Sequence, residues 1–231
     1  LGFVCLDIKI DRKGISIIND LKIIYNYYIY FNKLKPFFIL SFTVKPNIYA
    51  SIVSKILKIK IINNVSGLGT VFIKKNLITT IVINLYRFSI KKSHMVFFQN
   101  HYDKNEFIKK NITNKNNSFV IPGSGIELDK YKYNKVPNKK TITFLYLGRL
   151  IWDKGLSELF EVIKLLKPKY SHIEFNIVGN IDLSNNTYVD QSIINDLIDK
   201  KFINFHNFQE NSIKFINESD CIVLPSYREG L

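Results

Sequence analysis

TITFLYLGRLIWDKG, residues 141–155, decides the fold expected for this chain. Its first seven residues are apolar, aromatic or β-branched and predict a buried strand over 141–147. A glycine and two cations follow, and the helical pattern of 154–167 comes directly after them. A strand that runs through a glycine-containing turn into a helix predicts a parallel α/β unit, in which ligands bind at the carboxyl ends of the strands.

The same alternation of short apolar runs and longer helical patterns covers the rest of the chain. Residues 129–140, DKYKYNKVPNKK, are polar and show no apolar period, which predicts a linker. We therefore expect an α/β protein with two Rossmann-like domains, residues 1–128 and 141–231, joined by residues 129–140 and facing each other across a cleft. Further strands are predicted at 37–42, 60–65, 95–99, 118–121, 173–178, 202–206 and 221–224, and helices at 15–34, 47–57, 75–92, after Tyr102, 189–200 and 211–217.

The chain is strongly basic, with 33 Lys and Arg against 19 Asp and Glu and a formal net charge of +14. This balance favours anionic partners: phosphate ligands, an anionic membrane surface or nucleic acid. Cys5 and Cys221 lie far apart, so they predict no metal site and fit a reduced, cytoplasmic compartment. No apolar stretch approaches the roughly 18 to 20 residues of a spanning helix, so we expect contact with a membrane surface only.

Polar groups and glycines follow three predicted strands of the second half. Arg149 and Lys154 stand beside the start of a helix, where backbone amides also favour anions, and this combination suits a diphosphate. A surface loop with two solvated cations is the alternative interpretation. Gly179 and Asn180 close a second strand, and Pro225 to Gly230 close a third. If the strands are parallel, all three groups meet at one edge of the sheet.

The three segments GRLIWDKG (148–155), FNIVGNID (175–182) and INESDCIVLPSYREG (216–230) resemble the nucleotide-sugar-binding half of retaining GT-B glycosyltransferases of the "glycosyl transferases group 1" type. The resemblance implies that Arg149 and Lys154 neutralise the donor diphosphate and that Glu229 contacts the donor sugar. A second glutamate of the family would fall beyond Leu231, so the chain is expected to be incomplete there. Other residues expected to bind donor are Gly148, Gly179, Asn180, Ser226, Tyr227 and Gly230.

The first half resembles a narrower group, the bacterial surface-polysaccharide enzymes that add N-acetylgalactosamine or a similar sugar to an undecaprenyl-diphosphate-linked acceptor. Ser66 stands where many relatives have a histidine, which puts any mechanism using that histidine in doubt. The fold normally begins with a strand and a glycine-rich loop that would precede Leu1, so the chain is expected to be incomplete at this end too. The resemblance places Ser66, Gly67, Lys45 and Asn47 on the acceptor side; the segments that carry it are 10–16, 41–49, 63–69, 97–100 and 121–126.

These observations predict a hexosyltransferase that moves a sugar, expected to be an N-acetylhexosamine, from a UDP-sugar to a lipid-linked saccharide in capsule or lipopolysaccharide synthesis. Retention of configuration is implied by the resemblance alone. Two cations supply the charge at the site and no Asp-x-Asp pair ends a strand, so we expect that no metal ion is needed. We also expect no cofactor; the UDP-sugar is the donor substrate. Basic-aromatic stretches at 21–35 and 74–92, with Lys74, Lys75, Lys91 and Lys92, are expected to contact anionic membrane, which predicts a peripheral protein on the inner face of the cytoplasmic membrane.

Two alternatives remain open on the sequence. The charge and the aromatic residues are compatible with a basic nucleic-acid-binding module, but the basic residues are dispersed and no helix-turn-helix, RRM, KH or zinc pattern is found. We therefore expect no nucleic-acid partner. The second alternative is an inactive glycosyltransferase remnant.

Overall fold

The structure is a computed structural model that describes residues 4–8, 10, 16–68, 77–132, 140–183 and 185–230, with the side chain of residue 78 excepted. By their internal contacts the residues form two compact units. The first comprises residues 1–125 with 230–231, and the second comprises residues 126–229. The predicted linker, 129–140, begins with the short 3-10 helix η3 (Leu128–Lys130), and residues 133–139 lie outside the described part.

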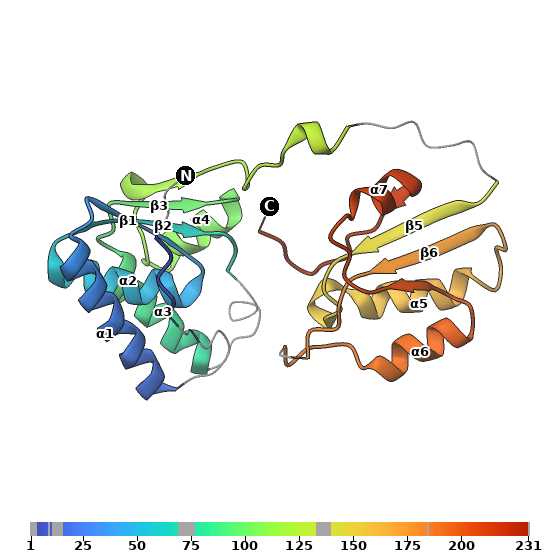
Figure 1. Ribbon diagram of the computed structural model, residues 1–231, viewed down its shortest axis with the longest axis horizontal. Helices are drawn as coiled ribbons and strands as arrows, with labels where there is room; N and C mark the ends of the chain where they lie inside the picture. Colours follow the sequence, from blue (N-terminus) through green and yellow to red (C-terminus); the bar gives the residue numbers. More distant parts are fainter. Residues whose placement is uncertain are drawn as a thin grey trace. The chain divides into compact units, whose positions relative to one another are not determined.

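The first unit is a parallel sheet with helices packed on it (Figure 1). Its strands follow one another in the order β1-β2-β3-β4, and all neighbours are parallel. In the view of Figure 1, α1, α2 and α3 lie below the sheet. The elements are α1 (Ile17–Leu34), β1 (Phe38–Phe42), α2 (Val44–Leu57), β2 (Lys60–Val65), α3 (Leu77–Ile90), β3 (Met95–Phe98), α4 (His101–Lys109), the 3-10 helix η2 (Lys115–Asn117) and β4 (Ser118–Val120).

Local signals in the sequence explain where these helices begin and end. Ser16 caps α1 by accepting a hydrogen bond from the Asn19 amide, and Asn100 caps α4 by accepting one from the Asp103 amide at 2.7 Å. Helix α2 begins at Val44, three residues before the predicted start. Its Pro46 lies in the first turn, where the missing N–H is not needed for an intrahelical bond, so proline is tolerated there.

The second unit has a sheet of order β7-β6-β5-β8, again with all neighbours parallel. In Figure 1, α5 and α6 lie below this sheet and α7 lies above it. The chain moves from β5 to β6 to β7 in one direction and then returns to place β8 on the other side of β5. The elements are β5 (Ile142–Leu147), the 3-10 helix η4 (Trp152–Lys154), α5 (Leu156–Leu166), β6 (Ile173–Val178), α6 (Gln191–Asp199), β7 (Asn204–His206), α7 (Ile213–Glu218) and β8 (Cys221–Ile222).

This strand order creates a topological switch point between β5 and β8. Open α/β sheets bind ligands outside the carboxyl ends of the strands at such a point, because loops that diverge to opposite faces leave a crevice between them. The loops that leave β5 and β8 are those that carry Arg149, Lys154 and Glu229. The fold therefore singles out the sheet edge to which the sequence motifs had pointed.

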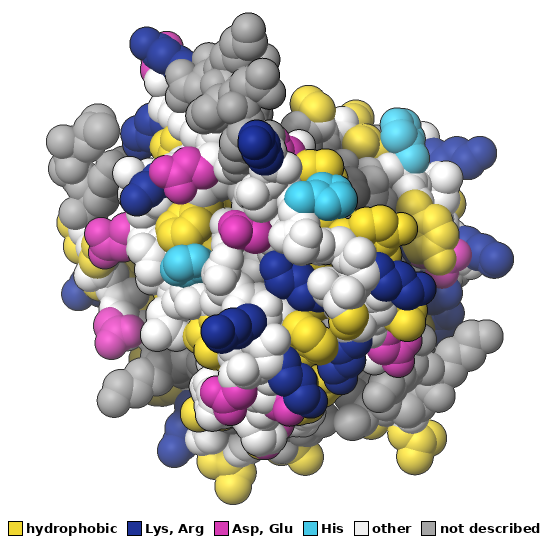
Figure 2. Space-filling model, turned by 90° about the vertical axis from the view of Figure 1, so that its right-hand side faces the viewer, with side chains coloured by type: hydrophobic (Ala, Val, Ile, Leu, Met, Phe, Trp, Pro, Cys, Tyr) yellow, Lys and Arg dark blue, Asp and Glu magenta, His cyan; other side chains and the backbone are white. Residues whose placement is uncertain are grey.

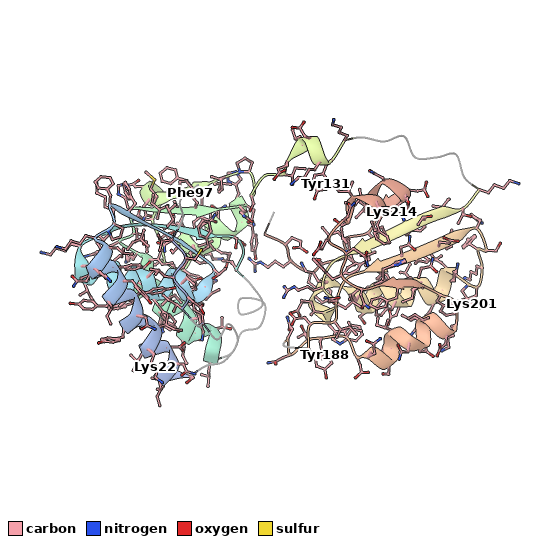
Figure 3. All side chains as sticks on the ribbon, viewed as in Figure 1. Lys22, Phe97, Tyr131, Tyr188, Lys201 and Lys214 are labelled. Carbon is pink, nitrogen blue, oxygen red and sulfur yellow. The ribbon has the colours of Figure 1, made fainter. Side chains whose placement is uncertain are left out.

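Each unit has its own hydrophobic core, and Figure 3 shows side chains filling the space between sheet and helices in both. In the first unit Phe98 and Phe107 are fully buried and pack edge to face with ring centroids 5.1 Å apart. In the second unit the buried face of α5 packs on β5 and β6 through Leu156, Phe160 and Ile163. Burial of this kind is the main force holding parallel strands between helices.

Most predicted elements are confirmed, with shifts of a few residues at their ends. The strands predicted at 60–65 and 173–178 have the predicted bounds. The strand predicted at 221–224 is shorter: pairing stops after Ile222, and Val223 makes one further backbone bond to Leu145. Among the described residues no helix is long and apolar enough to span a bilayer.

Candidate active site

The loop after β5 is fixed by its own neighbours. The Tyr146 hydroxyl donates a hydrogen bond to the carbonyl oxygen of Arg149 at 2.8 Å, which holds the turn in place. Gly179, at φ +152°, lies directly against Gly148: a Cβ on Gly179 would come within 1.8 Å of the Gly148 carbonyl oxygen. Only glycine allows this approach. The loops after β5 and β6 are therefore packed together by backbone contact.

The Arg149 guanidinium is paired with a carboxylate from the loop after β6. Its Nη1 lies 3.1 Å from Asp182 Oδ2, and the Arg149 side chain keeps 59% of its surface exposed. The pair is accessible to water, so its net stabilisation is small, on the order of 1 kcal/mol or less. An anion that offers two oxygens to the guanidinium fork can therefore compete with Asp182.

A pocket of about 560 Å³ opens at this sheet edge, within the second unit. It brings together four residues predicted to act on the donor, Gly148, Arg149, Gly179 and Asn180. Asn180 also orders the far wall, because its Oδ1 accepts a hydrogen bond from the Phe208 amide at 2.8 Å. The Phe208 ring is 65% exposed, so the pocket has an aromatic face beside its charged and glycine-lined base.

Lys154 and Glu229 form a second charged pair, between the loops after β5 and β8. Lys154 Nζ lies 2.5 Å from Glu229 Oε1, and both side chains are partly exposed, at 23% and 31%. Gly155, at φ +68°, makes this possible: a Cβ there would come within 2.1 Å of the Pro225 carbonyl oxygen. The close approach of these two loops at the start of α5 joins two residues 75 positions apart in the chain.

The electrostatics keep Glu229 ionised. Burial acts to raise the pKa of Glu229, but the hydrogen bond and charge of Lys154, together with the charge of Arg149, outweigh it and lower that pKa. Burial raises the pKa of Tyr146, and the charge of Glu229 adds to the effect. Tyr146 therefore stays a neutral hydrogen-bond donor between the two charged pairs.

Ser226 and Tyr227 extend the loop after β8. The Ser226 hydroxyl helps to lower the pKa of Glu229, although Ser226 Oγ is buried and makes no hydrogen bond of ordinary distance and angle with the described part of the chain. The Tyr227 hydroxyl donates to Glu158 Oε1 at 2.6 Å, and this bond lowers the pKa of Glu158. Tyr227 thus ties the loop to the first turn of α5.

Two residues on the predicted acceptor side lie in or beside a buried polar network. Asn47 is fully buried; its Oδ1 accepts from Ser41 Oγ at 2.6 Å and its Nδ2 donates to the Asn64 carbonyl oxygen at 2.9 Å. Its side chain therefore holds α2 against the strands; the assignment of Asn47 to the acceptor side stays a prediction. Lys45 is paired with Asp20 of α1, with Nζ and Oδ1 2.8 Å apart.

The other predicted positions are spread along the first unit. Ser66 is exposed directly after β2, and Gly67 follows it at φ +147°. Gly230, predicted to bind donor, is grouped by its contacts with the first unit rather than the second, and its carbonyl oxygen accepts a hydrogen bond from Asn100 Nδ2. Lys74 and Lys75 lie outside the described residues.

Sequence reasoning missed three residues that shape the site. Asp182 pairs with Arg149, Glu158 accepts from Tyr227, and Tyr146 holds the Arg149 backbone. Of the three, Asp182 had the clearest signal in the sequence, since it comes three residues after the glycine that follows β6. Within the described part of the chain, no group of three His, Cys, Asp or Glu side chains is placed to hold a metal ion; metal independence stays a prediction.

Comparison with known proteins finds similar sequences and folds. Residues 127–231 match the family model described as "Glycosyl transferases group 1". The chain is 28% identical over 182 residues to the N,N'-diacetylbacillosaminyl-diphospho-undecaprenol alpha-1,3-N-acetylgalactosaminyltransferase of Campylobacter jejuni, covering 72% of this chain and 46% of that protein. It is 24% identical to a capsular polysaccharide biosynthesis glycosyltransferase, CapM, of Staphylococcus aureus, covering 95% of this chain and 60% of the other.

Among solved structures, Anabaena HepE in complex with UDP aligns with a TM-score of 0.67 at 15% identity, over 91% of this chain and 57% of that one. Residues 127–231 are similar to group 1 glycosyltransferases, and the parallel α/β units have the fold of GT-B glycosyltransferases. The resemblance to surface-polysaccharide enzymes, including one that acts on a lipid-linked sugar, is confirmed. The chain spans about half the length of the curated relatives it matches.

Proposed function

We propose that this protein acts in the transfer of a sugar, an N-acetylhexosamine, from a UDP-sugar to a lipid-linked saccharide, with retention and without a metal ion. The observation that carries the proposal is the meeting of Arg149, Lys154 and Glu229 at the switch point of the second sheet. The relative from C. jejuni, whose name specifies a lipid-linked acceptor, supports the acceptor class.

The pocket after β5 and β6 suits the nucleotide. A diphosphate would lie against Gly148 and Gly179, where no side chain hinders its approach to the backbone, and Arg149 would exchange Asp182 for phosphate oxygens. The exposed ring of Phe208 would stack on the uracil base, as aromatic side chains commonly do with nucleobases.

The charged pair after β5 and β8 suits the sugar and the leaving group. As the bond to the diphosphate breaks, negative charge grows on the departing oxygens, and Arg149 and Lys154 would stabilise it. Glu229, kept ionised by Lys154, would accept hydrogen bonds from sugar hydroxyls and so orient the donor. Two cations would thus supply the charge that a metal ion supplies elsewhere.

The first unit would approach the lipid-linked acceptor at the inner face of the cytoplasmic membrane. Two of its helices have apolar side chains that stay exposed at helical spacing, which supports a surface contact with lipid. Basic residues accompany both stripes: Lys22 and Lys33 on α1, and Arg87, Lys91 and Lys92 at the end of α3. The stripes consist of Ile18, Leu21, Tyr25 and Ile29 on α1 and of Leu77, Ile81, Leu85 and Phe88 on α3.

Donor binding tests the proposal directly. We expect UDP and UDP-N-acetylhexosamines to raise the melting temperature of the chain, because a ligand that binds only the folded state stabilises it. ADP and a single-stranded oligonucleotide serve as comparison ligands. On the face in Figure 2, basic side chains are interspersed with hydrophobic and acidic ones, so we expect little response to the oligonucleotide. A shift with the oligonucleotide and none with UDP would refute the proposal.

The metal prediction has its own measurement. In the intact protein, turnover with excess chelator should equal turnover without it. Loss of turnover that Mg²⁺ or Mn²⁺ restores would show that Arg149 and Lys154 do not suffice to stabilise the leaving group.

A further inference from the structure

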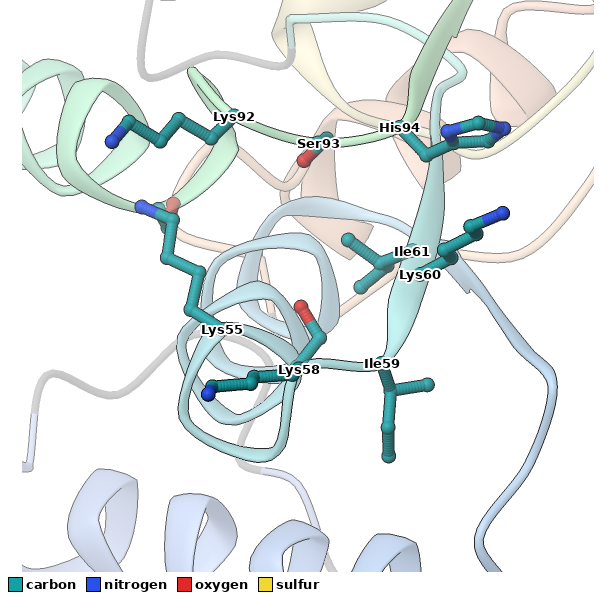
Figure 4. Close-up of a pocket in the computed structure, with 10 residues that line it drawn as sticks. Lys55, Lys58, Ile59, Lys60, Ile61, Lys92, Ser93 and His94 are labelled. Carbon is teal, nitrogen blue, oxygen red and sulfur yellow. The ribbon is translucent and has the colours of Figure 1, made fainter.

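The first unit contains a basic pocket that the proposed transfer reaction does not use. Its volume is about 270 Å³, room for roughly nine water molecules at about 30 Å³ each. In Figure 4 the side chains of Lys55, Lys58 and Lys92 extend to the left of the view and that of Lys60 to the right, with Ser93 near the top. The lining residues are Ser54, Lys55, Lys58, Ile59, Lys60, Ile61, Ser89, Lys92, Ser93 and His94.

The pocket lies at the opposite sheet edge from the predicted acceptor residues. It is built from the turn that joins α2 to β2 and the turn that joins α3 to β3, so it lies at the amino ends of the strands. Ser66 and Gly67, in contrast, follow the carboxyl end of β2. A ligand in this pocket would therefore occupy a separate site.

The charges in the pocket are of one sign. No Asp or Glu is among its lining residues, and Lys55, Lys58, Lys60 and Lys92 have no ion pair with a described residue. Lysines at helix ends often serve only to offset the helix dipole, and Lys55 does donate to the Phe88 carbonyl at the end of α3. Two helix ends contribute about one negative charge in all, which leaves most of the lysine charge without compensation.

A buried hydroxyl provides an independent sign of a ligand. Ser93 is only 7% exposed, and its Oγ has no hydrogen-bond partner among the residues that the structure describes. Buried hydroxyls in folded proteins nearly always have a partner, because burying an unpaired one is unfavourable. Ser93 and Lys92 both line the pocket, so an anion that reaches the Ser93 hydroxyl would receive a hydrogen bond and lie among the lysines.

The lowered pKa of Lys55 is consistent with an anion-binding pocket. Burial lowers the pKa of Lys55, and the charge of Lys92 lowers it further. Like charges held together in a partly buried space repel each other, and a bound anion would relieve the repulsion.

Exposed aromatic rings border the pocket. Lys60 Nζ lies 5.8 Å from the ring centroid of Phe37 and 5.7 Å from that of Phe38, and Lys55 Nζ lies 5.0 Å from that of Phe88. Phe37 is 79% exposed and Phe88 66%. Phe88 also ends the apolar stripe of α3, so the basic pocket adjoins the surface that is proposed above to contact lipid.

We infer that this pocket binds a phosphate group, held by Lys58, Lys92 and the Ser93 hydroxyl. The phosphate can belong to a soluble phosphate or diphosphate or to the headgroup of an anionic phospholipid; the recognition chemistry is the same. The inference extends the proposed membrane contact of the first unit and is independent of donor binding by the second.

Calorimetric titration with inorganic pyrophosphate at low ionic strength tests the site. The titration uses the R149A/K154A variant of the chain, so that the proposed donor site does not contribute. We expect binding that weakens about tenfold or more in Lys58→Gln/Lys92→Gln, and roughly three- to tenfold in Ser93→Ala, in line with the loss of charged and neutral hydrogen bonds.

A matched control separates the pocket from the general charge of the chain. Lys109→Gln/Lys115→Gln removes the same charge from exposed positions of the same unit and should leave pyrophosphate binding unchanged. An equal loss in this control, or no effect of Ser93→Ala, would overturn the inference. UDP titration of Lys58→Gln/Lys92→Gln with Arg149 and Lys154 intact should match the wild type, so failure of the donor proposal is recognised separately.

Vesicle sedimentation distinguishes the two sources of phosphate. Vesicles of phosphatidylglycerol and phosphatidylcholine are compared with vesicles of phosphatidylcholine alone. Sedimentation with the anionic vesicles that Lys58→Gln/Lys92→Gln and Ser93→Ala both weaken assigns the pocket to lipid. Pyrophosphate binding without such sedimentation assigns it to a soluble ligand. If neither probe binds in a way that depends on Ser93, the inference is wrong.

Discussion

The carboxyl edges of the two sheets differ in the kind of polar side chain that they carry. In the second unit, the loops after β5, β6 and β8 carry full charges, and Arg149 and Lys154 are each paired with a carboxylate from another loop. In the first unit, the end of β1 and the adjoining part of β2 carry neutral groups, with Ser41, Asn47 and Asn63 joined by buried hydrogen bonds. The charged pairs of the second unit stay partly accessible, whereas the side chains of Ser41, Asn47 and Asn63 in the first unit are enclosed.

This difference separates polar groups that bind from polar groups that hold the fold. A half-exposed ion pair contributes little to stability, so a ligand can displace one partner at small cost. A buried amide that has its hydrogen bonds cannot be exchanged in this way, because removing it leaves buried groups unpaired. We therefore expect that replacing charged residues at the site of the second unit lowers the rate of sugar transfer. Replacing buried polar residues of the first unit should instead lower the free energy of unfolding.

The largest effect is expected at the charged pairs. Arg149→Ala and Lys154→Ala should each reduce the rate of sugar transfer by the intact protein about 10²-fold or more, because each removes a group that stabilises the leaving diphosphate. Initial rates at saturating donor measure this. Lys200→Ala is the matched control, since Lys200 pairs with Asp196 on the exposed surface of α6 and should leave the rate unchanged. Wild-type rates in both site variants would show that the diphosphate binds elsewhere.

The buried network should respond in stability instead. Asn63 Nδ2 donates to Ser41 Oγ at 2.7 Å and to Ser51 Oγ at 2.9 Å, so Asn63→Ala should lower the free energy of unfolding by about 2 kcal/mol or more. Urea unfolding measures the change. Asn204→Ala provides the comparison, because Asn204 Nδ2 donates to Asn176 Oδ1 on an exposed edge strand. Equal effects of the two substitutions would contradict the role assigned to burial.

The aromatic wall of the donor pocket should contribute less than its charges. Phe208→Ala should weaken UDP binding about tenfold, the loss expected when a base loses its stacking partner. Phe208→Tyr keeps the aromatic face and should bind UDP normally. Titration calorimetry with UDP and with inorganic pyrophosphate sharpens the assignment, since only UDP has a base. A loss that is equal for both ligands would place Phe208 away from the base.

The smallest effect concerns pH. The pKa of Glu229 is lowered in the folded state, so ionised Glu229 stabilises the fold above its ordinary pKa of 4.5, and this stabilisation is lost as pH falls through the lowered value. The partly exposed pair limits the contribution to under about 1 kcal/mol. Glu229→Gln should reduce the loss of stability between neutral pH and pH values below 4.5. An unchanged pH profile would show that Lys154 does not stabilise the carboxylate.

Alternation of apolar runs with helical patterns was sufficient to predict the parallel α/β architecture and nearly all of its elements. The reason is that the periodicity of apolar residues within one segment indicates whether it forms a helix or a strand. The β5 segment with Gly148, Arg149 and Lys154 was found in the same way, since a glycine and cations at a strand end are local features. The role of Glu229 was predicted only from the resemblance to group 1 glycosyltransferases. The matched family model spans residues 127–231, which include all four of these residues.

Only the tertiary structure decided which polar groups meet. Lys154 and Glu229 are 75 positions apart, and they come together because β8 returns beside β5 and Gly155 admits the Pro225 carbonyl. The same holds for the enclosure of Asn47 and for the lysine pocket, which joins two turns separated by a whole strand and helix. Sequence patterns report the periodicity of one segment, whereas a side chain's partners and exposure depend on segments that are distant in the chain and near only after folding.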